Sequence, residues 1–271
     1  MNYSGLANKN HFNDSIWKEI FVEMEQYQKN FLINEKNFRS TQYKWPGDAL
    51  HNWSRIWEYP YVYFHLSRFV TDQYKTKIVD IGSGVTYFTP YLAEKKFFIS
   101  ATDIDPITKT DLSKALNLMN IDEKSAEVTT CTADRLPYDD KTFDIAISIS
   151  VIEHVEDYES TIKEIHRILN DNGKLILTLD IDLNGNHELK PERFITFMKI
   201  INRYFKVIVN EKTSHPLDVL TSLNSPYPYP VYKSAFHKLG KIIIRKVKDV
   251  LGIKYYKPFY LACMGLILEK N

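Results

Sequence analysis

The feature that most constrains the fold is a short apolar run followed by two closely spaced glycines, within residues 77–86. The run at 78–81 is rich in β-branched residues and predicts a buried strand. Gly82 and Gly84 can adopt backbone angles that other residues avoid, and they place no side chain between the backbone and a ligand. A helix predicted over 86–95 then points its first amide groups at the turn. Such a strand, turn and helix form half of a nucleotide-type pocket at the carboxyl end of a parallel sheet.

An acidic residue follows at the end of the next predicted strand. Residues 97–102 form that strand, and Asp103 ends it. A carboxylate there can accept both hydroxyl hydrogens of a ribose. A dinucleotide-binding turn would have a third glycine at position 87 to admit a pyrophosphate, but this chain has Tyr87. The pattern therefore favours a nucleoside over a dinucleotide, while an ordinary strand-turn-helix with a capping aspartate is the alternative for the glycine turn alone.

Predicted strands and helices alternate along the rest of the chain, which indicates an α/β fold with a parallel sheet and helices on both of its faces. Strands are predicted near residues 77–81, 97–102, 126–131, 143–149, 173–180, 205–209 and 261–268. Helices are predicted near 86–95, 106–119, 157–169 and 191–202. The length of 271 residues suits one large α/β domain with appendages.

Two appendages accompany this domain. Residues 1–75 are predicted to form an N-terminal helical cap, and 76–271 to form the α/β domain with an insertion at about 211–258. The insertion contains a predicted helix over 235–251, with one apolar side and strongly basic neighbours. This helix has two interpretations: a solvated surface helix, or a docking element for an anionic membrane or a phosphate-bearing acceptor.

The cap is predicted to contain helices over 15–31 and from Pro60 to about residue 70, with an aromatic-rich segment before Pro60. The aromatic rings could pack on the sheet edge or form a lid over the ligands. An arginine among aromatic rings suits a carboxylate, a sulfonium or a sugar ring, which favours the lid. Its candidate substrate contacts are Trp53, Arg55, Trp57 and Tyr59.

Composition excludes several function classes. The net charge of +1 gives no global attraction to nucleic acid. The two cysteines, Cys131 and Cys263, lie in apolar runs and are expected to be buried rather than bridged, and no CxxC or histidine-rich cluster suggests a structural metal. No apolar run reaches the roughly 18 residues of a membrane span, and the polar N-terminus lacks a signal region, so a cytoplasmic protein is expected.

Three further segments complete an ordered set of motifs with 80–84 and 103–106. They are residues 133–138, 150–155 and 168–175. Over residues 76–182 the set resembles the class I S-adenosylmethionine-dependent methyltransferases, closest to a methyltransferase type 11-like subgroup with a Leu/Ile-Glu-His signature after strand four. Thr86 stands where this family often has a third glycine, which tightens the turn without excluding the cofactor.

The resemblance implies a Rossmann-like sheet of seven strands, mostly parallel, with the last strand antiparallel. It implies S-adenosylmethionine as the cofactor and S-adenosylhomocysteine as the product. Thr132 replaces a frequent aspartate, so the adenine amino group is held by Asp134, by Thr132 or by the backbone. The implied cofactor-binding residues are Asp80, Gly82, Ser83, Gly84, Thr86, Asp103, Ile104, Ala133, Asp134 and Ser150.

An oxygen acceptor needs a base to take its proton. His154 is the first candidate, because imidazole titrates near neutrality and the signature lies beside the reacting methyl group in this family. His51, in the lid, is the second candidate. A third group, Asp180, Asp182 and His187, could bind a divalent metal, but solvated loop residues are the preferred interpretation and no metal is predicted.

The acceptor is expected to be a small molecule, because aromatic side chains with polar neighbours suit a carbohydrate or a phosphate-linked carrier. Methylation of a hydroxyl group of a sugar or related metabolite is the preferred hypothesis. Methylation of a small amine, methylation of a macromolecule and a non-catalytic cofactor-binding partner are the alternatives. No nucleic acid partner or membrane span is expected, peripheral membrane contact stays open, and the oligomeric state is not predicted.

Overall fold

A computed structural model gives the fold of the chain, and it describes residues 1–72, 75–132, 134–184, 189–209, 214–228 and 260–271. Ala133, His187 and the helix predicted at 235–251 lie outside these ranges. Within the described ranges, no helix combines the length and the apolar character that crossing a bilayer requires.

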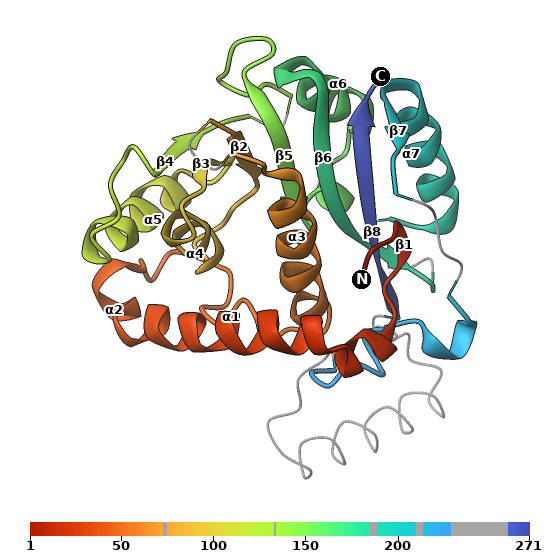
Figure 1. The fold of residues 1–271 in the computed structure, drawn as a ribbon, viewed down its shortest axis with the longest axis horizontal. Coiled ribbons are helices and arrows are strands. Elements are labelled where there is room, and N and C mark those ends of the chain that lie inside the picture. The colour runs from red at the N-terminus through yellow and green to blue at the C-terminus, as the bar shows by residue number, and fades with distance from the viewer. Residues whose placement is uncertain (73–74, 133, 185–188, 210–213, 229–259) are drawn as a thin grey trace, which may run out of the picture.

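The described part of the chain is built on one sheet of eight strands (Figure 1). Its order is β1-β8-β6-β5-β2-β3-β4, and β7 also pairs with β8. The strands are β1 (Gly5–Leu6), β2 (Lys77–Ile81), β3 (Phe98–Asp103), β4 (Ala126–Thr130), β5 (Phe143–Ile149), β6 (Leu169–Asp182), β7 (Phe205–Val207) and β8 (Leu261–Lys270).

The five strands from β2 to β6 pair in parallel, and β8 runs antiparallel to β6. This arrangement confirms the predicted mostly parallel sheet with an antiparallel last strand. The short strand β1 was not predicted: Gly5 pairs with Gly265 and Leu6 with Met264, so the N-terminal segment shares one edge of β8 with β7. The first residues of the chain therefore belong to the sheet as well as to the cap.

Helices cover both faces of the sheet. Successive residues of a strand point to opposite faces, so neighbouring apolar residues of β2 pack against helices on opposite sides. Ile78 packs with the cap and with α4 and α5, whereas Val79 packs with α6 and α7. Figure 1 shows α3 standing over β5 and β6, with α1 crossing below it. The helices are η1 (Lys9–Asn13), α1 (Ser15–Ile33), α2 (Glu35–Phe38), α3 (Arg55–Phe69), α4 (Phe88–Glu94), α5 (Pro106–Leu118), η2 (Ile152–His154), α6 (Tyr158–Ile168), α7 (Pro191–Tyr204) and η3 (Pro216–Asp218).

Helix α3 begins earlier than predicted. The prediction that Pro60 starts this helix is wrong, because α3 begins at Arg55 and contains Pro60 in its interior. A proline there cannot donate to the carbonyl group of Ile56. The indole Nε1 of Trp17, on α1, donates to that oxygen instead at 3.1 Å. A side chain far away in the sequence thus satisfies the backbone group that proline leaves without its usual helical donor.

Strand β6, predicted near residues 173–180, begins earlier, at Leu169. Phe143 pairs with Leu169 and Ile145 pairs with Lys174, so β6 contains extra residues between these two pairs. Asn172 has a φ of 60°, in the left-handed region that asparagine tolerates better than most residues. The segment is a bulge that begins β6 directly after α6.

We expect Trp17→Phe to lower the free energy of unfolding by about 1–3 kcal/mol, because it leaves the buried Ile56 carbonyl group without its indole donor. Urea denaturation followed by circular dichroism measures this change. Trp45→Phe is the control, since Trp45 is 63% exposed. Equal effects of the two substitutions would contradict the role assigned to Trp17.

Candidate functional site

The glycine turn leaves the carboxyl end of β2 with both glycines in the left-handed region. Gly82 has a φ of 74° and Gly84 a φ of 57°. A Cβ atom on Gly82 would collide with the side chain of Val151, and one on Gly84 would lie 2.8 Å from the hydroxyl oxygen of Tyr43. The turn therefore requires glycine for its backbone angles and for the side chains that approach it.

Asp103 ends β3 beside this turn. One carboxylate oxygen, Oδ2, accepts a hydrogen bond from the Gly84 amide at 2.9 Å, and Oδ1 accepts one from the Asp105 amide at 2.9 Å. Burial raises the pKa of Asp103, although these two backbone donors lower it. A carboxylate has about four acceptor positions, so it can also accept hydrogen bonds from ligand hydroxyl groups.

Asp80 lies on β2, one strand away. It is 4% exposed, and Thr89 Oγ1 donates to its Oδ2 at 3.3 Å. Burial raises the pKa of Asp80 to about 7, with the hydrogen bond from Thr89 lowering it and the charge of Asp103 adding to the rise. The structure thus gathers two carboxyl groups with raised pKa values at the carboxyl ends of β2 and β3.

Ser150 follows β5 and has a φ of 48°, which is uncommon for a residue with a side chain. Its hydroxyl group donates to Oε1 of Glu58 at 2.7 Å, and its amide donates to Thr178 O at 3.0 Å. Glu58 is fully buried on α3 and pairs with Arg55 on the same helix. Burial raises the pKa of Glu58, but the charge of Arg55 and the hydrogen bonds that Glu58 accepts hold it below its ordinary value. The cap is therefore bonded directly to the residue that follows β5.

A second buried carboxyl group stands beside this pair. Glu153 is 2% exposed, and its Oε1 accepts from the Asp180 amide at 3.1 Å. Its Oε2 has no hydrogen-bond partner in the part of the chain that the structure describes. Burial, with a smaller contribution from the charge of Glu58, raises the pKa of Glu153 to about 8.

Potential metal ligands also meet here. Ligand atoms of Glu58, Asp180 and Cys263 lie within 4.8 Å of one another. The guanidinium group of Arg55 already pairs with Glu58. Although burial lowers the pKa of Arg55, the charges of Glu58 and Asp180 raise it overall, so the guanidinium stays charged. The group of potential ligands therefore already contains a fixed positive charge.

The remaining residues implied for cofactor binding surround the glycine turn or lie on the surface. Thr86 Oγ1 donates to Ser83 O at 3.3 Å. The hydroxyl oxygen of Ser83 is buried and has no hydrogen-bond partner among the described residues, as expected where a ligand supplies one. Ile104, directly after Asp103, is 64% exposed, and Asp134 is exposed too. An exposed isoleucine at this position can cover a flat apolar ring.

Three aromatic residues predicted for the lid are almost fully buried. Trp57 is fully buried, and its Nε1 donates to Nδ1 of His11 at 2.9 Å. Trp53 is 4% and Tyr59 5% exposed. The ring of Tyr59 lies 5.2 Å from that of Tyr87 and 4.9 Å from that of Phe88, on the helix that follows the glycine turn. These rings build the packing between cap and sheet, and only Arg55 among the four predicted contacts joins the charged cluster.

The two candidate bases lie in different surroundings. His51 has both ring nitrogens engaged, Nδ1 with Asp48 at 2.7 Å and Nε2 with Glu25 at 3.1 Å. His154 is exposed and ends η2, directly after the residues that join β5 to the cap. His154 is the more exposed of the two candidate bases, since the side chain of His51 is only 19% exposed.

Sequence reasoning missed four residues that the structure brings to this edge: Arg39, Tyr43, Glu58 and Glu153. Glu153 belongs to the quoted signature, and Glu58 follows Arg55 at helical spacing, so a buried ion pair could have been suggested for that helix face. The positions of Arg39 and Tyr43 depend on how the connection from α2 to α3 folds back, for which the sequence holds no local signal.

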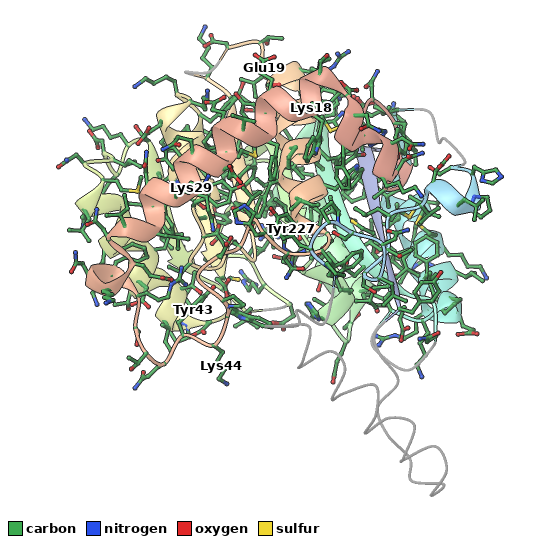
Figure 2. All side chains as sticks on the ribbon, turned by 90° about the horizontal axis from the view of Figure 1, so that it is seen from below. Lys18, Glu19, Lys29, Tyr43, Lys44 and Tyr227 are labelled. Carbon is green, nitrogen blue, oxygen red and sulfur yellow. The ribbon has the colours of Figure 1, made fainter. Side chains whose placement is uncertain are left out.

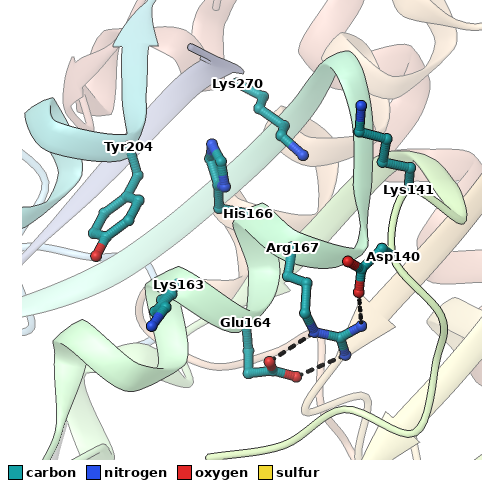
Figure 3. A pocket seen from close by; sticks show the side chains of 8 residues that line it. All are labelled: Asp140, Lys141, Lys163, Glu164, His166, Arg167, Tyr204 and Lys270. Atoms are coloured by element: carbon teal, nitrogen blue, oxygen red, sulfur yellow. Dashed lines mark hydrogen bonds and ion pairs between the residues drawn. The ribbon is translucent and has the colours of Figure 1, made fainter.

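A cavity lies at the opposite edge of the sheet, where the parallel strands begin (Figure 3). It measures about 330 Å³. Arg167 there pairs with Glu164 and with Asp140, and Lys141 pairs with Asp171. Much of its charge is therefore neutralised within the protein, and the cavity is separate from the glycine turn. Its lining residues are Asp140, Lys141, Lys163, Glu164, His166, Arg167, Tyr204 and Lys270.

Comparison with known proteins gives a family for this arrangement. A family model described as a methyltransferase domain matches residues 79–177. Ajmaline N-methyltransferase from Rauvolfia serpentina is 28% identical over 166 residues, which cover 58% of this chain and 53% of that protein. An uncharacterised protein from Methanocaldococcus jannaschii is 34% identical over 123 residues, which cover 45% of this chain and 48% of that protein. The chain thus spans about half the length of these two curated relatives.

The fold is also similar to solved structures. The crystal structure of the [4+2]-cyclase SpnF superposes with a TM-score of 0.58 at 14% identity, covering 92% of this chain and 94% of that one. At this identity the likeness concerns the fold alone. Since that protein is described as a cyclase, the fold by itself does not decide the reaction.

The raised pKa of Glu153 makes stability depend on pH. The folded protein holds this proton up to about pH 8, whereas the unfolded chain releases it near pH 4.5, so the free energy of unfolding should fall as pH rises between 6.5 and 8. The contribution is at most about 1.4 kcal/mol per pH unit. Glu153→Gln should reduce this slope, as measured by urea denaturation at several pH values.

The pH range of 6.5 to 8 is chosen because of His65, whose pKa is lowered by burial from 6.5 to about 4. Its effect on the free energy of unfolding has the opposite sign and falls mainly below pH 6.5. Glu19→Gln is the matched control, since Glu19 is exposed. A slope that Glu153→Gln leaves unchanged would show that Glu153 does not retain its proton in the folded protein.

Proposed function

Because the chain belongs to the class I S-adenosylmethionine-dependent methyltransferases, we propose that it transfers the methyl group of S-adenosylmethionine to a small-molecule acceptor, at a hydroxyl group of a sugar or a related metabolite. The observation that carries the cofactor part is the hydrogen bond from the Gly84 amide to Asp103, which brings the glycine turn and the end of β3 together. The acceptor part rests on the polar groups beside β5 and β6.

The residues around the turn fit a nucleoside. Asp103 can accept hydrogen bonds from ribose hydroxyl groups, and Ile104 can cover the adenine ring. Ser83 offers a buried hydroxyl group without a protein partner among the described residues. Asp80, in its ionised form, would attract the positive charge of the cofactor, and its raised pKa would fall when that charge arrives.

When bound, S-adenosylmethionine supplies an electrophilic methyl group, which the acceptor oxygen takes as the carbon–sulfur bond breaks and its electron pair stays on sulfur. The protein has to align the acceptor with that methyl group, and orientation of this kind lowers a barrier by roughly 7–11 kcal/mol. The Glu58–Ser150 hydrogen bond fixes the backbone at the end of β5, where the family signature begins. We assign this alignment to α3 and to the segment 150–155.

The hydroxyl proton of the acceptor goes to a base, and His154 is the proposed one. It is exposed, it follows the fixed Ser150 segment, and histidine is the side chain most often used as a general base. Glu153 is a less suitable base, because burial keeps its carboxyl group protonated up to about pH 8.

A small amine is the second candidate acceptor. Among the described residues at the ends of β5 and β6, the carboxylates of Glu58 and Asp180 lie beside the cation Arg55, and this excess of negative charge favours a positively charged group. One of the curated relatives is named as an N-methyltransferase. Parallel screens of hydroxylated and amino acceptors, with S-adenosylhomocysteine release as the readout, discriminate between the two candidates.

We expect Asp103→Ala to weaken the binding of S-adenosylhomocysteine about 10–100-fold, because it removes charged acceptors for the ribose hydroxyl groups. Isothermal titration calorimetry measures this affinity. Asp139→Ala, at an exposed aspartate, is the control. Unchanged affinity of Asp103→Ala would refute the assignment of the ribose site.

We expect His154→Ala to lower turnover about 10²–10⁴-fold with little change in cofactor affinity, because it removes the proposed base. His51→Ala should leave turnover close to that of the wild-type protein, since both of its ring nitrogens are engaged. Loss of turnover and cofactor affinity in equal measure would give His154 a structural role instead.

A further inference from the structure

The connection from α2 to α3 crosses the glycine turn and is bonded to it. Val85 O accepts a hydrogen bond from Nη2 of Arg39 at 2.9 Å, and the Val85 amide donates to the hydroxyl oxygen of Tyr43 at 2.7 Å. The guanidinium group of Arg39 lies 5.0 Å from the ring centre of Tyr43. Two cap side chains that support each other thus bond both backbone groups of one turn residue.

The connection is anchored at its start. The Ser40 amide donates to Oδ2 of Asp111, on α5, at 2.6 Å, and Asp111 is 1% exposed. Figure 2 labels Tyr43 and Lys44 on this connection, away from the long helix α1. The connection is therefore held by two parts of the domain: Ser40 bonds it to α5, and Tyr43 bonds it to the glycine turn.

The hydroxyl group of Tyr43 lies where the turn and Asp103 meet. Its oxygen is 2.8 Å from the position of a Cβ atom on Gly84, and the Gly84 amide donates to Asp103. Burial raises the pKa of Tyr43, and the charge of Asp103 raises it further, against the hydrogen bond from Val85 that lowers it. The phenol therefore keeps its proton at neutral pH.

This proton is available to a ligand. The Tyr43 oxygen already accepts a hydrogen bond from the Val85 amide, and its O–H group can still donate one. Among the hydrogen bonds of the described residues, the Tyr43 hydroxyl proton has no acceptor. The Tyr43 hydroxyl group and the Asp103 carboxylate together suit a ligand hydroxyl group, which can accept from the phenol and donate to the carboxylate.

We propose that Tyr43 is a cofactor-positioning residue, whose hydroxyl group donates to a ribose hydroxyl group that in turn donates to Asp103. The inference rests on the proposed function for its cofactor. It assigns the segment 39–43, rather than the aromatic residues of α3, as the part of the cap that contacts the nucleoside. Arg39 bonds the turn and lies against the ring of Tyr43, which it supports.

Tyr43→Phe tests the proposal, because it keeps the ring and removes only the hydroxyl group. Calorimetry is run with S-adenosylhomocysteine and with its 2′-deoxy and 3′-deoxy forms. Tyr43→Phe should bind S-adenosylhomocysteine about tenfold more weakly than the wild-type protein, and it should bind one of the two deoxy forms within about twofold of the wild-type affinity.

Tyr27→Phe is the matched control, since Tyr27 also bonds the cap to the domain, by donating to Glu94 on α4 at 2.9 Å. It should change none of the three affinities. Thermal unfolding of both variants provides a readout of any general loss of structure. Combining Tyr43→Phe with Asp103→Asn should cost less than the sum of the single effects, because both residues contact one hydroxyl group.

An unchanged affinity of Tyr43→Phe for S-adenosylhomocysteine would overturn the proposal. Equal losses for all three ligands would also overturn it, because they indicate a structural role for Tyr43. Wild-type protein that binds none of the ligands would instead contradict the proposed function itself, and this result is distinct from selective failure of the Tyr43 variant.

Discussion

The hydrogen bond from the Gly84 amide to the Asp103 carboxylate is the interaction on which the rest of the site depends. It joins the turn after β2 to the end of β3, and these strands are adjacent and parallel. The bond forms only if the turn adopts left-handed angles, which glycine permits. The glycine at position 84 thus fixes the position of the turn relative to the Asp103 carboxylate, which can bind the sugar of a ligand.

The cap is part of this site rather than a separate cover. Glu58 reaches across from α3 to Ser150, and Tyr43 and Arg39 reach from the preceding connection to Val85. Partnering a buried carboxylate with a cation and a hydroxyl group avoids the large cost of an isolated buried charge. These bonds end on residues at the carboxyl edge of the sheet. A substitution that moves the cap would therefore also move the glycine turn and the end of β5.

The sequence predicted the features that local patterns encode. The β-branched run before Gly82 marked β2, and the position of Asp103 marked the end of β3. The antiparallel β8 followed from the family resemblance. The start of α3 was missed, because the donor that replaces the missing amide of an interior Pro60 comes from the distant Trp17. Contacts such as Glu58 with Ser150, 92 residues apart, have no local signal, and the same is true of Tyr43 at the turn.

The central claim is that a nucleoside with a sulfur substituent lies across the carboxyl ends of β2 and β3. A crystal structure of the protein grown with S-adenosylhomocysteine tests it most directly. The account predicts ribose oxygens within hydrogen-bond distance of Asp103 and the adenine ring beside Ile104. A ligand bound elsewhere, such as in the cavity lined by Arg167 and Lys270, with the glycine turn unchanged, would contradict it.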